Sequence, residues 1–350
     1  MNIFSREQKI ISTLLEHGSA RSSDIHKMLV ERGEDISLVT VKRALADMTT
    51  QGVLLASGSG RSSSYHVSVL GRMFADIDAR AYCAIEPDRR YGQKRYNQDL
   101  FAGIPDTIFS PIELQKLEDA TTEYARRTTD IPPAIEKREL ERLVIELSWK
   151  SSKIEGNTYT LLDTEKLILE NKEAPGHSHS EARMILNHKD AFNFVRENTA
   201  FFRTLSRAHI EELHAILIKD LNVGEGLRER VVGIVGSLYQ PLDNLHQVRE
   251  GLEALIGTIA RVQTPYAKAL VALLGISYLQ PFEDGNKRTA RLLANAILLA
   301  YACAPLSYRS VEESEYREAM LVFYEISSIV PFKKIFIEQY DFAARNYSVK

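Results

Sequence analysis

The chain of 350 residues has two cysteines, no apolar run long enough to cross a membrane and a small net charge. Cys83 and Cys303 lack the spacing of metal ligands, and a single pair cannot form a disulfide framework, so we expect both to be packing residues. The longest apolar run, residues 292–306, covers about fifteen positions, fewer than the ~20 that a membrane helix needs. Residues 1–9 are charged and lack the apolar segment of a signal peptide. We therefore expect a cytoplasmic protein with no membrane partner.

The composition is typical of an ordinary soluble globular protein, with 44% apolar residues, 26% charged residues and a formal net charge of −3. This balance does not indicate a nucleic-acid or membrane partner for the chain as a whole. The length is enough for about two or three domains. We place them at residues 1–68, 69–133 and 134–350.

The first domain shows three short helical patterns, over residues 5–17, from Ser22 or Ser23, and from Ser37, followed by a β-hairpin pattern at residues 53–67. This order resembles a winged helix-turn-helix. The third helix and the wing would offer a DNA groove Thr40, Lys42, Arg43 and Arg61.

The charge of this domain is less typical of a DNA-binding protein. Residues 1–66 contain eight Lys or Arg against seven Asp or Glu, a net of +1, whereas a strong DNA footprint is more basic. Two interpretations stay open: contact with DNA, or contact with a protein, including a second copy in a homodimer.

The rest of the chain is predicted to be mostly α-helical. Residues 69–133 form a helical connector, whose last helix has Pro111 at its first position. Residues 224–241 change to the pattern of a short β-hairpin around Gly233 and Gly236. Histidines 177 and 179 are interpreted as loop residues, and His214 as a buried, satisfied residue.

The stretch from Gln280 to Arg291 lies between two apolar helical patterns, and its Pro281 and Gly285 mark a tight loop that opens a new helix. Lys287, Arg288 and Arg291 fall in the first turns of that helix, where the macrodipole disfavours cations by about 0.3–1 kcal/mol each. Bound polyphosphate would offset this cost, with Asp284 beside it to hold Mg²⁺. The alternative is a surface helix whose Asp284 or Asn286 is an N-cap.

A second long helix is predicted from residue 134 to Glu155, ended by Gly156. A carboxylate at the negative end of a helix is as unfavourable as cations at the positive end of another. We therefore expect Glu155 to face the cationic loop. The alternative is a surface carboxylate next to a helix cap.

Both motifs resemble those of the Fic (Fido) family. The stretch from Gln280 to Arg291 is similar to the family signature His-Pro-Phe-x-Asp/Glu-Gly-Asn-Gly/Lys-Arg-x-x-Arg at every position but the first. Ser151-x-x-x-Glu155-Gly156 is similar to an inhibitory motif that some Fic proteins carry on a helix N-terminal to the core. The resemblance covers roughly residues 148–347. It implies a mostly α, Fic-like helical bundle with a small β-hairpin flap, here at residues 224–241, that holds a target segment.

The resemblance also implies an activity: transfer of AMP from ATP to a hydroxyl side chain of a target protein, or of the chain itself. The cofactors would be ATP and Mg²⁺. Asp284 would hold the metal; Gly285, Asn286 and Lys287 would line the anion hole, and Arg288 and Arg291 would bind the outer phosphates. We expect Asn295, one turn further on, to reach the nucleotide.

The inhibitory motif implies autoinhibition. Its glutamate would pair with Arg291 and keep the γ-phosphate from seating productively. Ser151 lies one turn before Glu155, and we expect it to hydrogen-bond the carboxylate.

Gln280 stands where the family has its general-base histidine. A primary amide can orient a hydroxyl but cannot accept its proton near neutral pH, and loss of a general base costs about 10²–10⁴ in rate. The sequence therefore supports a weakened protein adenylyltransferase, or an inactive nucleotide-sensing, DNA-binding transcriptional regulator. Removal of AMP from a target, with Glu155 aligning water, is a third reading. His246 is the histidine to test as a substitute base.

Overall fold

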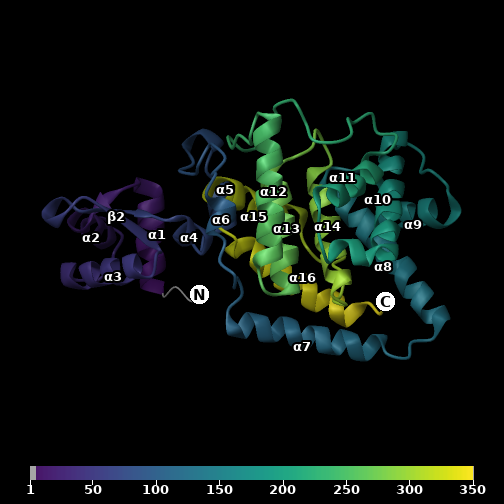
Figure 1. Cartoon of the computed structure of the whole chain (residues 1–350), viewed down its shortest axis with the longest axis horizontal. Helices are drawn as coiled ribbons and strands as arrows, with labels where there is room; N and C mark the ends of the chain where they lie inside the picture. The colour runs from purple at the N-terminus through teal and green to yellow at the C-terminus, as the bar shows by residue number, and fades with distance from the viewer. Residues whose placement is uncertain (1–4, 350) are drawn as a thin grey trace. The chain divides into compact units, whose positions relative to one another are not determined.

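The computed structural model describes residues 5–349 and all of their side chains except that of Arg61, so the predicted DNA contact by Arg61 lies outside the described part. The fold is mostly helical, as expected (Figure 1). The helices are α1 (Ser5–His17), α2 (Ser22–Glu31), α3 (Leu38–Thr50), α4 (Val69–Met73), α5 (Ala79–Cys83), α6 (Leu100–Gly103), α7 (Pro111–Thr128), α8 (Pro133–Ile154), α9 (Leu161–Glu170), α10 (His179–Glu197), α11 (Arg207–Ile218), α12 (Leu245–Arg261), α13 (Pro265–Leu279), α14 (Asn286–Ala300), α15 (Glu313–Ile326) and α16 (Val330–Asn346). The strands are β1 (Ala20–Arg21), β2 (Leu54–Ser57) and β3 (Ser64–Val67), and short 3-10 helices cover Gly60–Ser62, Pro87–Arg89 and Thr199–Phe202.

The chain divides into two compact units. The first contains residues 5–105, 234–240 and 318–332 of the described part. The second contains residues 106–233, 241–317 and 333–349. Helices α15 and α16 therefore each contribute residues to both units. No helix in the described part of the chain is long and apolar enough to cross a membrane.

The first unit begins with three helices and an antiparallel sheet. The predicted order of three helices followed by a hairpin is confirmed, and Ser37 caps α3 by accepting a hydrogen bond from the Thr40 N–H at 3.2 Å. The sheet order is β1-β3-β2, with Leu54 opposite Val67, and the short β1 was not predicted.

Two of the predicted DNA contacts, Lys42 and Arg43, are exposed on α3. The winged-helix assignment and the DNA contact stay predictions.

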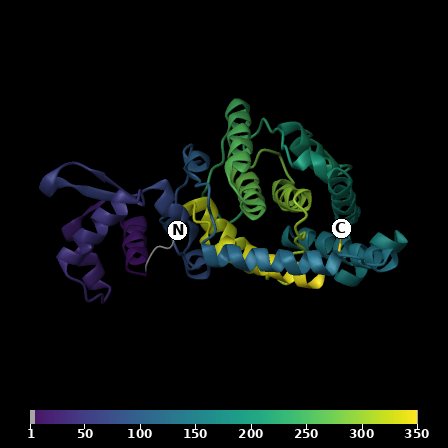
Figure 2. The same ribbon diagram turned by 60° about the horizontal axis from the view of Figure 1, so that its bottom comes forward.

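The second unit is built around α13, a helix whose residues are buried on every side, which is expected of a helix that is apolar all round. Helix α12 packs on one side of α13, α14 packs on another, and α10 contacts α14 in turn (Figure 1). Helix α7 lies alongside the part of α16 that belongs to this unit (Figure 2). Contacts between them include Lys333 Nζ, 2.8 Å from Glu113 Oε2, the hydroxyls of Thr121 and Tyr340, 2.6 Å apart, and a hydrogen bond from Arg127 Nη1 to the Ala344 carbonyl at 3.2 Å.

The predicted β-hairpin flap is wrong, because residues 224–241 contain no strand. Their only strand-like contact in the described chain is a single bridge between Gln240 and Arg95. Val231 and Val235 are 69% and 99% exposed, so their β-branched side chains do not pack against an apolar surface. An isolated two-stranded hairpin is marginally stable at best, and the glycines weaken this one further.

Candidate functional site

The loop between α13 and α14 is the predicted loop that opens a helix, and the structure confirms it. Helix α13 ends at Leu279, and Gln280 follows it in the left-handed region, with φ 50° and ψ 59°. Gly285 precedes α14 with φ 77°, a conformation that glycine adopts without steric cost. The loop therefore delivers its residues to the N-terminus of α14 through two left-handed positions.

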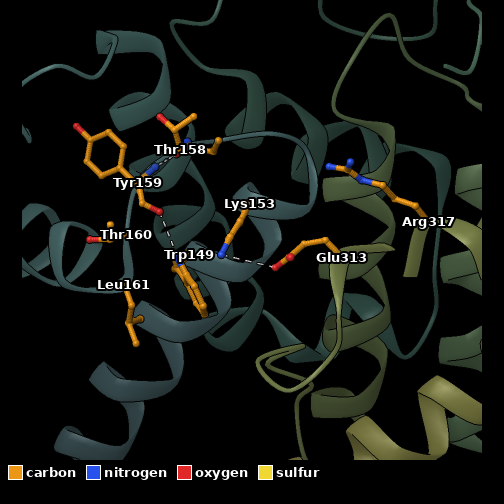
Figure 3. Close-up of a pocket in the computed structure, with 9 residues that line it drawn as sticks. Trp149, Lys153, Thr158, Tyr159, Thr160, Leu161, Glu313 and Arg317 are labelled. Atoms are coloured by element: carbon orange, nitrogen blue, oxygen red, sulfur yellow. Dashed lines mark hydrogen bonds and ion pairs between the residues drawn. The ribbon is translucent and has the colours of Figure 1, made fainter. Parts of the chain in front are cut away.

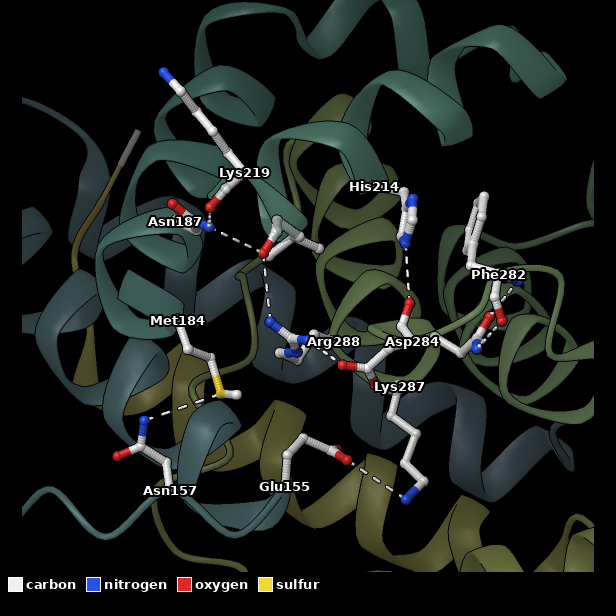
Figure 4. A network of polar contacts seen from close by, with 12 residues as sticks. Glu155, Asn157, Met184, Asn187, His214, Lys219, Phe282, Asp284, Lys287 and Arg288 are labelled. Atoms are coloured by element: carbon white, nitrogen blue, oxygen red, sulfur yellow. Dashed lines mark hydrogen bonds and ion pairs between the residues drawn. The ribbon is translucent and has the colours of Figure 1, made fainter. Parts of the chain in front are cut away.

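Two side chains hold the middle of this loop (Figure 4). The Asn286 amide donates to the Phe282 carbonyl at 2.8 Å and accepts from the Phe282 N–H at 2.9 Å. His214, on α11, stacks on the Phe282 ring with centroids 3.7 Å apart and planes within 5°. Its Nε2 lies 2.9 Å from the Asp284 carbonyl oxygen. The Asn286 side chain therefore ties the loop together through the backbone of Phe282.

His214 is buried, as the sequence predicts, but it is satisfied only at Nε2, because its buried Nδ1 has no hydrogen-bond partner among the described residues. Burial lowers the pKa of His214 to about 4; the hydrogen bond to the Asp284 carbonyl opposes this shift, and Arg288 adds to it. The ring is therefore neutral at pH 7, with its hydrogen on Nε2 because a carbonyl can only accept. A group with this pKa is a weak base, so His214 positions the loop.

Arg228 holds the first part of the loop, and sequence reasoning missed it. Its Nε donates to the Gln280 carbonyl at 2.6 Å, and its backbone N–H donates to the Pro281 carbonyl at 2.9 Å. The guanidinium also donates to the carbonyls of Arg230, at 2.9 Å, and Leu242. All four acceptors are backbone carbonyls: two belong to the loop, about fifty positions from Arg228 in sequence, and two are nearer to it in the chain. No sequence pattern could have revealed them.

Gln280 is 8% exposed, and its Nε2 donates to the Ser277 carbonyl at 2.6 Å. The amide is thus held against the end of α13 at the position where the family has its base. The proposed substitute, His246, lies in the first turn of α12, with its Nδ1 3.4 Å from Glu250 Oε1. Both side chains of this contact are on the exposed surface of α12.

Arg291 lies at the centre of the polar contacts and is 0% exposed. Its Nε donates to Ser151 Oγ at 2.8 Å, and its Nη2 donates to both the Ser151 carbonyl and Glu155 Oε1 at 2.8 Å. The guanidinium also lies over the Tyr316 ring, 5.5 Å from the centroid, with Nη1 3.4 Å from the Tyr316 hydroxyl. The predicted meeting of the two helix ends is confirmed.

Glu155 is the C-cap residue of α8, and its carboxylate contacts two of the three cations of α14, Lys287 and Arg291. Gly156 follows it with φ 98°, as expected after a helix end. Lys287 Nζ lies 3.4 Å from Glu155 Oε2 (Figure 4). Burial alone would raise the pKa of Glu155, but Arg291 and then Lys287 hold this pKa below its usual value. The carboxylate is therefore ionised at neutral pH.

Arg288 points away from Glu155, toward α11 (Figure 4). It is 1% exposed; its Nη1 donates to the Leu217 carbonyl at 3.3 Å and its Nη2 to Asp284 Oδ2 at 3.2 Å. Burial lowers the pKa of Arg288, but an arginine stays charged at neutral pH. A phosphate group that bound Arg288 would therefore have to replace its contact with Asp284.

Asp284 fits a metal ion that is held mainly by a nucleotide. Its side chain is 67% exposed, and the described residues contain no cluster of three His, Cys, Asp or Glu that could form a metal cage. Mg²⁺ commonly takes one or two carboxylates, with phosphates and water completing its shell. A single exposed aspartate beside the cationic helix start matches that ligand set.

Two predicted contacts differ from the structure. Ser151 binds Arg291 and not the Glu155 carboxylate, because the arginine donors reach its hydroxyl and carbonyl directly. Asn295 is 0% exposed, and its amide donates to the Leu306 carbonyl at 2.9 Å and accepts from the Leu306 N–H at 2.7 Å. Both ends of the Asn295 amide thus hold the chain after α14, and its full burial keeps the side chain away from the surface at which a nucleotide would bind.

The comparisons with known proteins agree with this site. Residues 204–298 match the Fic/DOC family. The protein adenylyltransferase Fic of Nematostella vectensis is 28% identical over 188 residues, which are 52% of this chain and 44% of the relative. The protein adenylyltransferase Fic of Drosophila melanogaster is 22% identical over 255 residues, 65% of this chain and 52% of the relative. The chain thus spans about half the length of these curated relatives.

Solved structures show the same fold. Fic-1 from C. elegans superposes with a TM-score of 0.58 at 20% identity, covering 67% of this chain and 72% of that one. A Fic domain containing signaling protein from Bacteroides thetaiotaomicron has a TM-score of 0.55 at 20% identity, covering 65% and 94%. The matched residues include α11, α13 and the start of α14, which hold the loop described above. The chain therefore carries a Fic/DOC family domain, with Fic protein adenylyltransferases among its homologues.

Proposed function

We propose that this protein binds ATP with Mg²⁺ at the loop between α13 and α14 and is of the protein adenylyltransferase type. Glu155 would restrain it, and Gln280 would weaken its chemistry. The observation that supports this most is the contact of Glu155 with Arg291 at 2.8 Å. It places a carboxylate on the buried arginine to which the family resemblance assigns an outer phosphate.

The electrostatics of the loop favour an anion. Lys287, Arg288 and Arg291 all lie within the first two turns of α14, where unpaired N–H groups and the macrodipole add to their positive potential. Glu155 and Asp284 are the carboxylates that pair with them. Triphosphate carries enough negative charge to take over both pairs, which would release Asp284 for the metal.

The reaction would be displacement at the α-phosphorus of ATP. The target hydroxyl oxygen would bond to that phosphorus, the bond to the bridging oxygen would break, and pyrophosphate would leave with the electron pair. Bound Mg²⁺, held by Asp284 and the phosphates, would neutralise phosphate charge. The hydroxyl proton would pass to solvent, because the Gln280 amide cannot accept it. Orientation and phosphate binding would remain as sources of rate acceleration.

Isothermal titration with ATP and Mg²⁺ tests the nucleotide site. We expect Glu155→Gly to bind ATP at least about tenfold more tightly than the unaltered chain, since about 1.4 kcal/mol of competing ion pair is removed. Glu170→Gly, at the exposed end of α9, is the matched control and should leave ATP affinity unchanged. If Glu155→Gly binds no ATP, the proposed function is wrong.

A second function is favoured by two observations together: the exposed Lys42 and Arg43 on α3, and the absence of a base at Gln280. The protein would then be a nucleotide-sensing, DNA-binding regulator. A gel shift with genomic fragments tests this, and it should respond to ATP and weaken in Lys42→Gln and Arg43→Gln. Half-buried Thr40, which contacts Ser37, should matter less. An identical shift with and without ATP would count against the regulator.

A further inference from the structure

A cavity of 490 Å³ lies beside the C-terminal end of α8, between that helix, residues 157–161 and the first turns of α15 (Figure 3). Its wall includes Trp149, Lys153, Tyr159, Leu161, Glu313 and Arg317. None of its lining residues belongs to the loop between α13 and α14. Its volume falls within the range of about 300–1,000 Å³ that is usual for small-molecule sites.

The apolar part of the wall is centred on Trp149. The indole Nε1 donates to the Tyr159 carbonyl at 3.1 Å, which fixes the ring. Lys153 Nζ lies 5.1 Å from the centroid of the ring, and Leu161 completes the apolar surface. A fixed, flat indole with a cation beside it is suited to a flat apolar group that carries a negative charge.

The charged side chains that line the cavity include two cations, Lys153 and Arg317, and one carboxylate, Glu313, so the wall is net positive. Glu313 is held by Lys150 in a close ion pair, and Lys153 Nζ is 3.9 Å from the same carboxylate (Figure 3). Arg317 donates from Nε at 3.2 Å and from Nη2 at 2.6 Å to a neutral acceptor, the Ile154 carbonyl. Within residues 5–349, Arg317 has no carboxylate partner. One carboxylate thus serves two lysines, and the guanidinium remains uncompensated.

We propose that this cavity binds a small molecule with a flat apolar body and a carboxylate or phosphate group. The body lies against Trp149, and the anionic group lies between Lys153 and Arg317. The second compact unit would then contain a ligand site separate from the loop between α13 and α14.

Arg317 connects the cavity to the end of α8, next to Glu155. Arg317 caps the end of α8 through the Ile154 carbonyl, and Ile154 directly precedes the glutamate that contacts Arg291. An anion that draws Arg317 away removes this cap and loosens the helix end that presents Glu155. This second step rests on the proposed function: occupancy of the cavity would favour nucleotide binding.

Trp149 is the only tryptophan in the chain, so intrinsic fluorescence reports on the cavity directly. The full-length protein is titrated with benzoate, with phenyl phosphate and with uncharged benzyl alcohol. We expect a saturable change with at least one of the two anions and none with the alcohol. The two anions distinguish a carboxylate site from a phosphate site.

Variants test whether the cations bind the probe. Lys153→Gln and Arg317→Gln should each weaken binding about tenfold, the usual effect of losing one hydrogen bond to a charged group. Lys166→Gln, an exposed residue of α9 outside the cavity, removes the same charge and should change nothing. Absence of saturable change with both anions, or unchanged affinity in both cavity variants, would overturn the proposal.

The coupling is measured separately, by titrating ATP in the presence of saturating benzoate. We expect ATP affinity to rise at least about threefold in the unaltered chain and to stay constant in Glu155→Gly, which has no restraint left to release. Unchanged ATP affinity in the unaltered chain would overturn the coupling. If Glu155→Gly binds no ATP at all, the proposed function fails, while the fluorescence titration still decides the cavity.

Discussion

Glu155 and Arg291 lie 136 positions apart in the sequence, and their carboxylate and guanidinium meet at 2.8 Å. Glu155 is at the negative end of α8, and Arg291 is in the second turn of α14, near its positive end. Each charge is unfavourable on its own helix, and each is stabilised by the other. Whatever anion binds at α14 therefore has to compete with a carboxylate that belongs to the chain.

Glu155→Gln should lower the free energy of unfolding in the absence of nucleotide. Arg291 is fully buried, and loss of one charged partner from such a group costs about 1–3 kcal/mol. Urea unfolding checks this, with Glu170→Gln as the exposed control, and ATP with Mg²⁺ should restore more stability in Glu155→Gln than in the unaltered chain. Unchanged stability would mean that Ser151 and Tyr316 alone satisfy the guanidinium.

Gln280→His should raise the rate of AMP transfer by about 10²–10⁴ in a chain that also carries Glu155→Gly. Histidine tolerates the left-handed conformation of this position, where φ is 50°. Incorporation of label from α-labelled ATP into the protein measures the rate. Gln280→Asn keeps an amide and also tolerates this conformation, so it should show no gain; an equal gain from both changes would exclude a general-base effect.

His214 should make stability depend on pH between about 4 and 6.5. Its folded pKa is lowered from 6.5 to about 4, so the unfolded chain binds more protons in this interval and stability falls as the pH drops through it. The expected slope is at most about 1.4 kcal/mol per pH unit.

Urea unfolding of His214→Gln and His214→Phe at several pH values checks this prediction. Neither side chain titrates, so both should flatten the dependence in that interval. Glutamine can still donate to the Asp284 carbonyl, whereas phenylalanine keeps only the stacking on Phe282. A slope equal to that of the unaltered chain in both variants would contradict the assigned shift.

Asn295→Ala should destabilise the protein without changing ATP affinity. The substitution leaves the buried N–H and carbonyl of Leu306 without their partners, at a cost of about 1–3 kcal/mol for each group. Lys287→Ala provides the contrast, because it should weaken ATP binding with little loss of stability. A drop in ATP affinity at unchanged stability for Asn295→Ala would restore the nucleotide contact expected from the sequence.

Local patterns were enough to predict several parts of this structure. The helical period and the glycines placed the loop before Asn286 and the end of α8 to within one residue, because helix ends depend on residues a few positions away. The charges at these two ends predicted that they meet. Three short helices and a hairpin at the N-terminus were predicted for the same local reasons.

Long-range packing decided the rest. Arg228 and His214 hold the loop through backbone carbonyls and a stacked ring, and such acceptors exist at every position of a sequence. Asn295 looked like a nucleotide contact by its spacing, but the backbone of Leu306 takes both ends of its amide. The hairpin pattern at residues 224–241 lacks an apolar face on which to pack, so no strand forms. A sequence states which groups can bond, and only the folded chain brings them within bonding distance.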